Sequence, residues 1–205
     1  MADFPIDLDD GLADRLVRVL DVEGKIPGAL EALGPVADRD VLLLDGSGGL
    51  RAGQLRELGA RVEVMAPSES RASAVADASA DVLVAFWSSF RGVEAAEMEE
   101  AARIVRPGGR LLVVHDYGRD DVSALRGDLP DYGPWSRRDG PFLRSGFKIR
   151  VVHCWWTFES LDDARQFLGE AFGEVGTNVG SGLTRPRLSY NVAVYHRTLG
   201  EPSAV

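Results

Sequence analysis

The chain has 205 residues, a hydrophobic share of 45% and a formal net charge of -9. This length and apolar share predict a single globular domain over residues 1–205, with a sizeable buried core. The negative charge repels phosphate backbones and anionic lipid, and no Lys/Arg stripe offsets it, so we expect neither nucleic acid nor a membrane as a partner.

The first 35 residues predict two N-terminal helices. Asp10 is the expected N-cap of the first, because apolar residues follow it at helical spacing until Gly24 and Pro27 interrupt the pattern. A second, short helix is expected over 28–33. The same stretch holds no apolar run with a basic start, so we expect no secretory signal, no membrane span and a cytoplasmic protein.

Residues 41–117 alternate between short apolar runs and helical patterns, which predicts a Rossmann-like, doubly wound and mostly parallel α/β sheet. The expected strands are 41–44, 62–65, 81–86 and 110–115, and the expected helices are 50–58 and about 93–105. The run Arg106-Pro107-Gly108-Gly109 is the stop signal of the second helix. Residues 67–70 begin either a short helix or a loop.

The last third of the chain changes character. Residues 118–146 are rich in Gly, Pro, Asp and Arg, which predicts a surface excursion that is either a lid or a docking surface. A strand over 147–158, a helix over 160–172 and a strand over 188–196 then predict an antiparallel C-terminal edge (147–197) on the parallel sheet. Trp155 and Trp156 should point to opposite faces of their strand. The lone cysteine, Cys154, is expected to be buried.

The order of these parts resembles the class I S-adenosylmethionine-dependent methyltransferases of the type 11-like kind. The stretches that carry the likeness are VLLLDGSGG, LRELGARVEVMAPS, ADVLVAFWSSF and EEAARIVRPGGRLLVVHDY, followed by GFKIRVVHCWWTFES and LSYNVAVYHR. The resemblance implies S-adenosylmethionine at the carboxyl ends of the first strands, and a small molecule as the substrate.

Carried onto this chain, the resemblance implies a cofactor site at the carboxyl ends of two strands, formed by Asp45, Gly46, Ser47, Gly48, Gly49, Phe86 and Trp87. The pattern departs from the family twice: Ser47 stands where a glycine is expected, and Ala66 stands where an acidic residue binds the ribose. Only 14 residues separate Ala66 from Asp81. We therefore expect a degenerate cofactor half with one βα unit shortened or missing.

The carboxyl end of strand 110–115 supplies the candidate catalytic residues. His115 is the expected general base with a pKa near neutral, Asp116 orients it or binds an amine, and Tyr117 hydrogen-bonds or stacks. The alternative is that His115 and Asp116 satisfy backbone groups of the loop. The histidines are scattered along the chain, so we expect no metal site.

Two functions follow from these features. The first is S-adenosylmethionine-dependent methyl transfer to a small molecule. The alternative is a non-catalytic protein of the same fold that does not bind S-adenosylmethionine and serves as a binding, regulatory or self-assembling module. A dehydrogenase is a third option, although alanine at position 66 impairs ribose recognition there as well.

Overall fold

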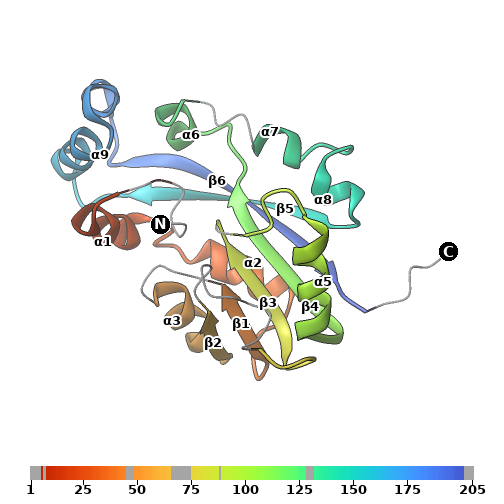
Figure 1. Cartoon of the computed structure of the whole chain (residues 1–205). Helices are drawn as coiled ribbons and strands as arrows, with labels where there is room; N and C mark the ends of the chain where they lie inside the picture. Colours follow the sequence, from red (N-terminus) through yellow and green to blue (C-terminus); the bar gives the residue numbers. More distant parts are fainter. Residues whose placement is uncertain are drawn as a thin grey trace.

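The computed structural model describes residues 6, 8–44, 49–65, 75–87, 89–127 and 132–200. Within these residues a mixed sheet has the strand order β2-β1-β3-β4-β6-β5 (Figure 1). Its strands are β1 (Asp40–Leu44), β2 (Arg61–Met65), β3 (Ala80–Phe86), β4 (Val105–Asp116), β5 (Lys148–Thr157) and β6 (Arg187–Thr198). The pairs among β1 to β4 are parallel, and β6 is antiparallel to both β4 and β5. The predicted fold class is confirmed.

Helices cover both faces of the sheet. One face packs against α1 (Asp10–Val19), α2 (Lys25–Leu33), α3 (Leu50–Glu57), α6 (Asp121–Leu125) and α9 (Leu161–Gly182), and the other against α5 (Ala95–Ile104), α7 (Tyr132–Trp135) and α8 (Pro141–Arg144). Val41 and Leu43 join the first core, whereas Leu42 joins the second. A strand buried on both faces explains the continuous apolar run. No described helix is long and apolar enough to cross a membrane.

The two N-terminal helices begin earlier than the sequence predicts. Asp9, not Asp10, caps α1, since its carboxylate accepts a hydrogen bond from Leu12 N at 2.9 Å. Helix α2 begins at Lys25 and contains Pro27. Proline in a first helical turn costs no hydrogen bond, because the N–H groups there have no partner within the helix. Pro27 therefore does not interrupt the chain here as expected.

Strand β4 begins at Val105, before the predicted turn, and not at Arg110. Val105 pairs with Ala80, and the pairing resumes at Val82 and Arg110 after a shift in register. The Pro-Gly-Gly run is thus accommodated as an irregularity within the strand. Such a bulge places extra residues on one strand without ending its pairing with the neighbour.

The excursion 118–146 is partly a core element. It contains α6, α7 and α8, and it buries Trp135 and Phe142. The ring of Phe142 stacks on Tyr195 of β6, with centroids 3.8 Å apart and an angle of 11° between the planes. The sequence predicts a surface excursion here. The segment is partly buried instead, because Trp135 and Phe142 lie among its Gly, Pro and Arg residues and pack into the core.

Helix α9 is longer than predicted, because it continues past Phe172 as a second segment. The two segments meet at Gly173, whose φ of 59° and ψ of -132° lie outside the helical region. A Cβ atom at Gly176 would lie 1.8 Å from the carbonyl oxygen of Leu168. Arg165 Nε also reaches the carbonyl of Gly180 at 3.2 Å. The two coils of α9 in Figure 1 therefore pack against each other as a hairpin.

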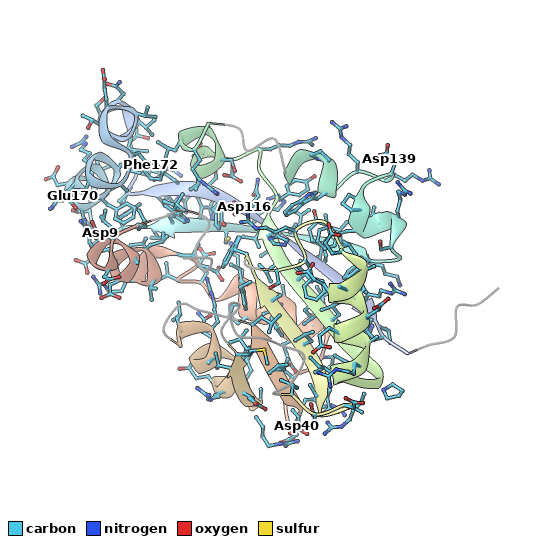
Figure 2. The ribbon with its side chains drawn as sticks, in the orientation of Figure 1. Asp9, Asp40, Asp116, Asp139, Glu170 and Phe172 are labelled. Atoms are coloured by element: carbon cyan, nitrogen blue, oxygen red, sulfur yellow. The ribbon has the colours of Figure 1, made fainter. Side chains whose placement is uncertain are left out.

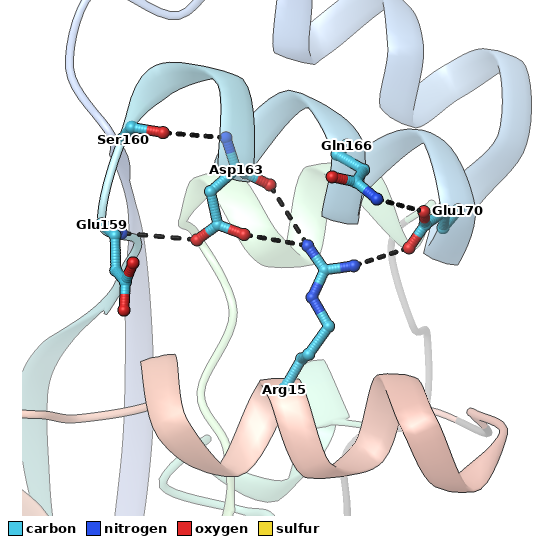
Figure 3. A network of polar contacts seen from close by, with 6 residues as sticks. All are labelled: Arg15, Glu159, Ser160, Asp163, Gln166 and Glu170. Atoms are coloured by element: carbon cyan, nitrogen blue, oxygen red, sulfur yellow. Dashed lines mark hydrogen bonds and ion pairs between the residues drawn. The ribbon is translucent and has the colours of Figure 1, made fainter.

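Arg15 fastens α1 to the first segment of α9 (Figure 3). Its Nη1 lies 2.6 Å from Glu170 Oε2, and its Nη2 lies 2.9 Å from Asp163 Oδ1. The guanidinium also lies over the ring of Phe167, 5.3 Å from the centroid. The α9 hairpin is thereby held against the N-terminal helix.

Strand β2 is the outer strand at its end of the sheet in the part of the chain that the structure describes. The class I methyltransferase order expected from the sequence has a further βα unit at this end. The apolar side chain of Val64 on β2 is exposed. Residues 66–74 lie outside the described residues, so the shortened cofactor half stays a prediction.

Candidate functional site

The carboxyl ends of β1, β3 and β4 meet at one edge of the sheet, because these strands are parallel neighbours. The predicted turn residues Asp45, Gly46, Ser47 and Gly48, and likewise Ala66, lie outside the described residues. Gly49 is described. It has a left-handed φ of 98°, precedes the first turn of α3, and has no atom of the described residues within 4 Å of the place a Cβ would take.

Phe86 and Trp87, both predicted to bind the cofactor, end β3 with fully buried rings. Their centroids are 5.5 Å apart. Trp87 N donates to the carbonyl of Val114 at 2.9 Å, and its φ of 46° is unusual for a residue with a side chain. A non-glycine residue held in this conformation is fixed by its surroundings.

Arg51 is a residue of α3 that the sequence analysis overlooked, and its guanidinium lies over these two rings. It is 3% exposed, and its guanidinium carbon lies 5.2 Å from the Phe86 centroid and 5.6 Å from the Trp87 centroid. Its Nη1 donates to Gln54 Oε1 at 2.8 Å. A signal existed in the sequence: Arg51 is four residues before buried Leu55, and positions i and i+4 share a helix face.

Asp21 is a second buried charge near this edge that the sequence analysis did not select. Its carboxylate accepts hydrogen bonds from Lys25 N at 3.0 Å and Ile26 N at 2.7 Å. Burial raises the pKa of Asp21, while these backbone bonds and the positive charge of Arg51 oppose the rise. Asp21 thus lies within electrostatic reach of Arg51, which itself contacts the aromatic pair.

Both carboxylate oxygens of Asp116 are engaged, and Figure 2 labels this residue among the side chains of the interior. Oδ1 accepts hydrogen bonds from Trp87 Nε1 at 3.1 Å and from the hydroxyl of Tyr190. Oδ2 forms a buried ion pair with Arg126. Asp116 therefore joins β3, β4, β6 and α6. Such a carboxylate positions its neighbours and is poorly placed to orient His115.

His115 points to the opposite face of β4 from Asp116, as strand alternation requires. It is fully buried, its Nε2 lies 3.1 Å from the carbonyl oxygen of Ser89, and its ring contacts Trp135 edge-on at 4.7 Å. Burial, assisted by the charge of Arg91, lowers the pKa of His115 to about 3. Burial thus opposes the near-neutral pKa expected of a general base, and the catalytic role of His115 stays a prediction.

Tyr117 is the most accessible of the three predicted catalytic residues. It is half-buried, its N–H donates to the carbonyl of Asn191 at 2.9 Å, and Arg119 lies over its ring at 5.9 Å. The structure thus places His115, Asp116 and Tyr117 in sequence along one strand but does not bring their functional groups together. Their catalytic role stays a prediction, and Tyr117 is the best placed for contact with a substrate.

The remaining aromatic and histidine candidates lie on β5 and β6. Trp156 is buried and Trp155 is half-buried under Arg187, on opposite faces as predicted. His153 and His196 lie on β5 and β6. Among the described residues, no group of three or more His, Cys, Asp or Glu side chains is arranged to hold a metal ion.

Comparisons with known proteins find structures but no sequence relatives. No family model and no curated protein matches the chain. A protein assigned as a type II methyltransferase from Anaeromyxobacter dehalogenans has a TM-score of 0.55 at 17% identity, with 86% of this chain and 96% of that chain covered. A protein assigned as a methyltransferase of antibiotic biosynthesis from Anabaena variabilis has a TM-score of 0.55 at 15% identity, with coverages of 89% and 99%.

A third structure, phosphoethanolamine N-methyltransferase 2 of Haemonchus contortus in complex with S-adenosylmethionine, has a TM-score of 0.52 at 13% identity. The match covers 95% of this chain and 58% of that one. Together with the strand order, these likenesses establish the fold: the chain has the Rossmann-like fold of the class I methyltransferases. At such identities a shared fold does not fix the chemistry of the site.

Proposed function

From the class I methyltransferase fold, we propose that this chain binds S-adenosylmethionine at the carboxyl edge of β1 and β3 and transfers a methyl group to a small molecule. The observation that carries the proposal is the buried Arg51 over Phe86 and Trp87, with the buried Asp21 within its electrostatic reach. The Haemonchus contortus enzyme, which shares the fold, was solved with this cofactor.

The described residues suit the methionine end of the cofactor. That end carries a carboxylate and an ammonium group, and Arg51 and Asp21 offer the opposite charges in a buried setting, where ionic interactions are strong. Among the described residues, none approaches the Cβ position of Gly49 at the start of α3. When bound, S-adenosylmethionine supplies an electrophilic methyl group. We assign no residue to the adenosine end, because position 66 lies outside the described residues.

The chain's own residues define which acceptors suit the reaction. His115 is buried and neutral, and Asp116 is bound on both oxygens, so neither is placed to accept a proton from a substrate. We therefore propose an acceptor that attacks without a buried base, such as a neutral amine or a thiolate. Tyr117, half-buried at the end of β4, would contact it. Proximity and alignment would then supply most of the acceleration.

A second candidate is the non-catalytic protein that does not bind S-adenosylmethionine. The position of Arg51 favours it, because the guanidinium lies over the aromatic faces that would otherwise attract a sulfonium. Two cations on the same faces repel each other. Arg51 thus either binds the cofactor's carboxylate or competes with its sulfonium, and the two roles make opposite predictions.

Isothermal titration of the full chain with S-adenosylmethionine and S-adenosylhomocysteine separates the candidates. If Arg51 binds the carboxylate, Arg51→Met weakens both ligands by about tenfold or more, the usual scale for a lost charged hydrogen bond. The exposed Arg39→Met is the matched control and should leave binding unchanged. Circular dichroism and thermal unfolding verify that each variant is folded.

Absence of heat with either ligand at millimolar concentration would sink the proposal. Tighter binding of S-adenosylmethionine by Arg51→Met than by the wild type would favour the second candidate. Asp21→Asn gives an independent check, because it removes the charge expected to face the ammonium group and leaves the positive charge of Arg51 in place.

A further inference from the structure

A groove of about 410 Å³ lies between α2 and β5, and none of the residues that line it belongs to β1, β3 or α3. One wall is the small-residue side of α2, with Gly28, Ala29 and Ala32. The other wall is the stretch of β5 from Arg150 to His153. Because the α2 side chains are short, the groove stays open along the strand.

Strand β5 is the outer strand at this end of the sheet, and its outer edge is partly unpaired. Near its end, the carbonyl of Trp155 accepts a hydrogen bond from Asp21 N at 2.9 Å, so the odd-numbered residues direct their backbone groups outward. Val151 and His153 share this parity. Within the described residues no other backbone segment pairs with them, which leaves hydrogen-bonding groups facing the groove.

The groove and its surroundings are basic, although the chain carries a net charge of -9. Lys25 and Arg150 line the groove itself; Lys25 is paired with Glu23, so Arg150 and the neighbouring Lys148 carry the basic character. Lys148 pairs with His196 across β5 and β6, and burial together with the nearby charges of Lys148 and Arg110 lowers the pKa of His196. In the described part of the chain, Lys148 and Arg150 are exposed and form no ion pair.

This charge pattern decides between a second copy of the chain and a different partner. Two antiparallel β5 strands would bring Lys148 and Arg150 of both copies together, and lysine on an edge strand is a common means of preventing such pairing. The same basic side chains would attract an extended segment with acidic side chains. Its backbone would pair with Val151 and His153, and its carboxylates would face Lys148 and Arg150.

We propose that the groove between α2 and β5 binds an extended acidic peptide segment of a partner protein, which adds a strand to the free edge of β5 at Val151 and His153. The main-chain hydrogen bonds give affinity, and the basic side chains select acidic residues at alternate positions. This binding does not depend on S-adenosylmethionine and stands apart from the proposed methyl transfer.

The test uses the full chain and two blocked heptapeptides, one alternating valine with glutamate and one alternating valine with lysine. Fluorescence anisotropy of labelled peptide measures affinity, and amide hydrogen exchange reports on β5. The glutamate peptide should bind and protect the amides of Val151 and His153, and binding should weaken as salt rises. The lysine peptide should bind at least about tenfold more weakly.

Three variants make the result specific. Val151→Pro should abolish binding, because it removes the outward N–H that would pair with the peptide. The variant should still fold, because the fold does not use this N–H and proline is tolerated on edge strands. Arg150→Glu should weaken the glutamate peptide by about tenfold or more. Arg39→Glu makes the same charge change at an exposed position outside the groove and should leave binding unaltered. Thermal unfolding verifies that each variant is folded.

Equal binding of the two peptides, or unchanged binding by Val151→Pro, would overturn the proposal. So would a dimer in sedimentation equilibrium that Val151→Pro dissociates, because a second copy would then occupy the edge.

Discussion

The indole Nε1 of Trp87 lies 3.1 Å from Asp116 Oδ1 and joins the end of β3 to the end of β4 inside the protein. Tyr190 and Arg126 bind the same carboxylate, so strands β3, β4 and β6 and helix α6 converge on one side chain. The carboxylate of Asp116 therefore links these elements at the carboxyl edge.

Asp116→Asn should lower the free energy of unfolding by about 3 kcal/mol, because it removes the buried carboxylate charge that pairs with the guanidinium of Arg126. Urea unfolding followed by circular dichroism measures this loss. The exposed Asp139→Asn makes the same chemical change and should stay within about 0.5 kcal/mol of the wild type. Equal stabilities of the two variants would show that the carboxylate does not stabilise this edge.

His115 should make the protein less stable as the pH falls. Its folded pKa of about 3 lies below the ordinary value of 6.5, so only the unfolded chain takes up this proton between those values. This group alone should lower the free energy of unfolding by about 1.4 kcal/mol per pH unit below pH 6.5. Stability measured from neutral pH downward should therefore fall less steeply in His115→Phe than in the wild type.

Burial raises the pKa values of Asp21 and Asp120, so these two residues favour the folded state as the pH falls. Both are present in the wild type and in His115→Phe, so their effects cancel when the two stabilities are subtracted. The control is His153→Gln, at an exposed position on β5. A constant difference between the wild type and His115→Phe at every pH would contradict the buried, neutral imidazole.

Cys154 should resist alkylation while the protein is folded. The side chain is 2% exposed, and burial raises the pKa of its thiol to about 12, so both access and the thiolate fraction are small at pH 8. Mass spectrometry after iodoacetamide treatment should show an unmodified native chain and a singly modified chain in guanidinium chloride. Native labelling at the rate of a free thiol would refute this burial.

Arg15→Met should loosen α1 from α9 and lower the free energy of unfolding by about 1 kcal/mol, because the partly exposed guanidinium joins two carboxylates (Figure 3). Faster hydrogen exchange in α1 should accompany the loss. Arg18→Met, an exposed position on the same helix, should change neither quantity. Similar behaviour of both variants would assign no stabilising role to the contacts in Figure 3.

Much of the fold could be predicted because local sequence patterns determined it. The run Val41–Leu44 is buried on both faces, and Phe167 and Leu168 form the inward side of α9, so apolar pattern and structure agree. The hairpin of α9 could not be foreseen in this way. The hairpin depends on the non-helical backbone at Gly173 and on the close backbone contact at Gly176. Neither feature leaves a trace in the apolar periodicity.

The site was harder to predict than the fold. Topology correctly placed Phe86 and His115 near the ends of neighbouring strands, yet strand alternation directs His115 and Asp116 to opposite faces, and burial changes what the imidazole can do. Arg51 and Asp21 were overlooked because a charge in a helical pattern is usually solvated. The packing of α3 in the core buries Arg51, and the bonds from the first turn of α2 hold Asp21 in a buried position.

The closeness of Gly176 to the Leu168 carbonyl has a consequence for sequence comparison. Since not even a methyl group fits at position 176, proteins of this fold that carry another residue there must connect β5 to β6 by a different path. A glycine at this position, together with one at 173, is therefore a marker by which chains with the same helical hairpin can be recognised when overall identity is too low to align them.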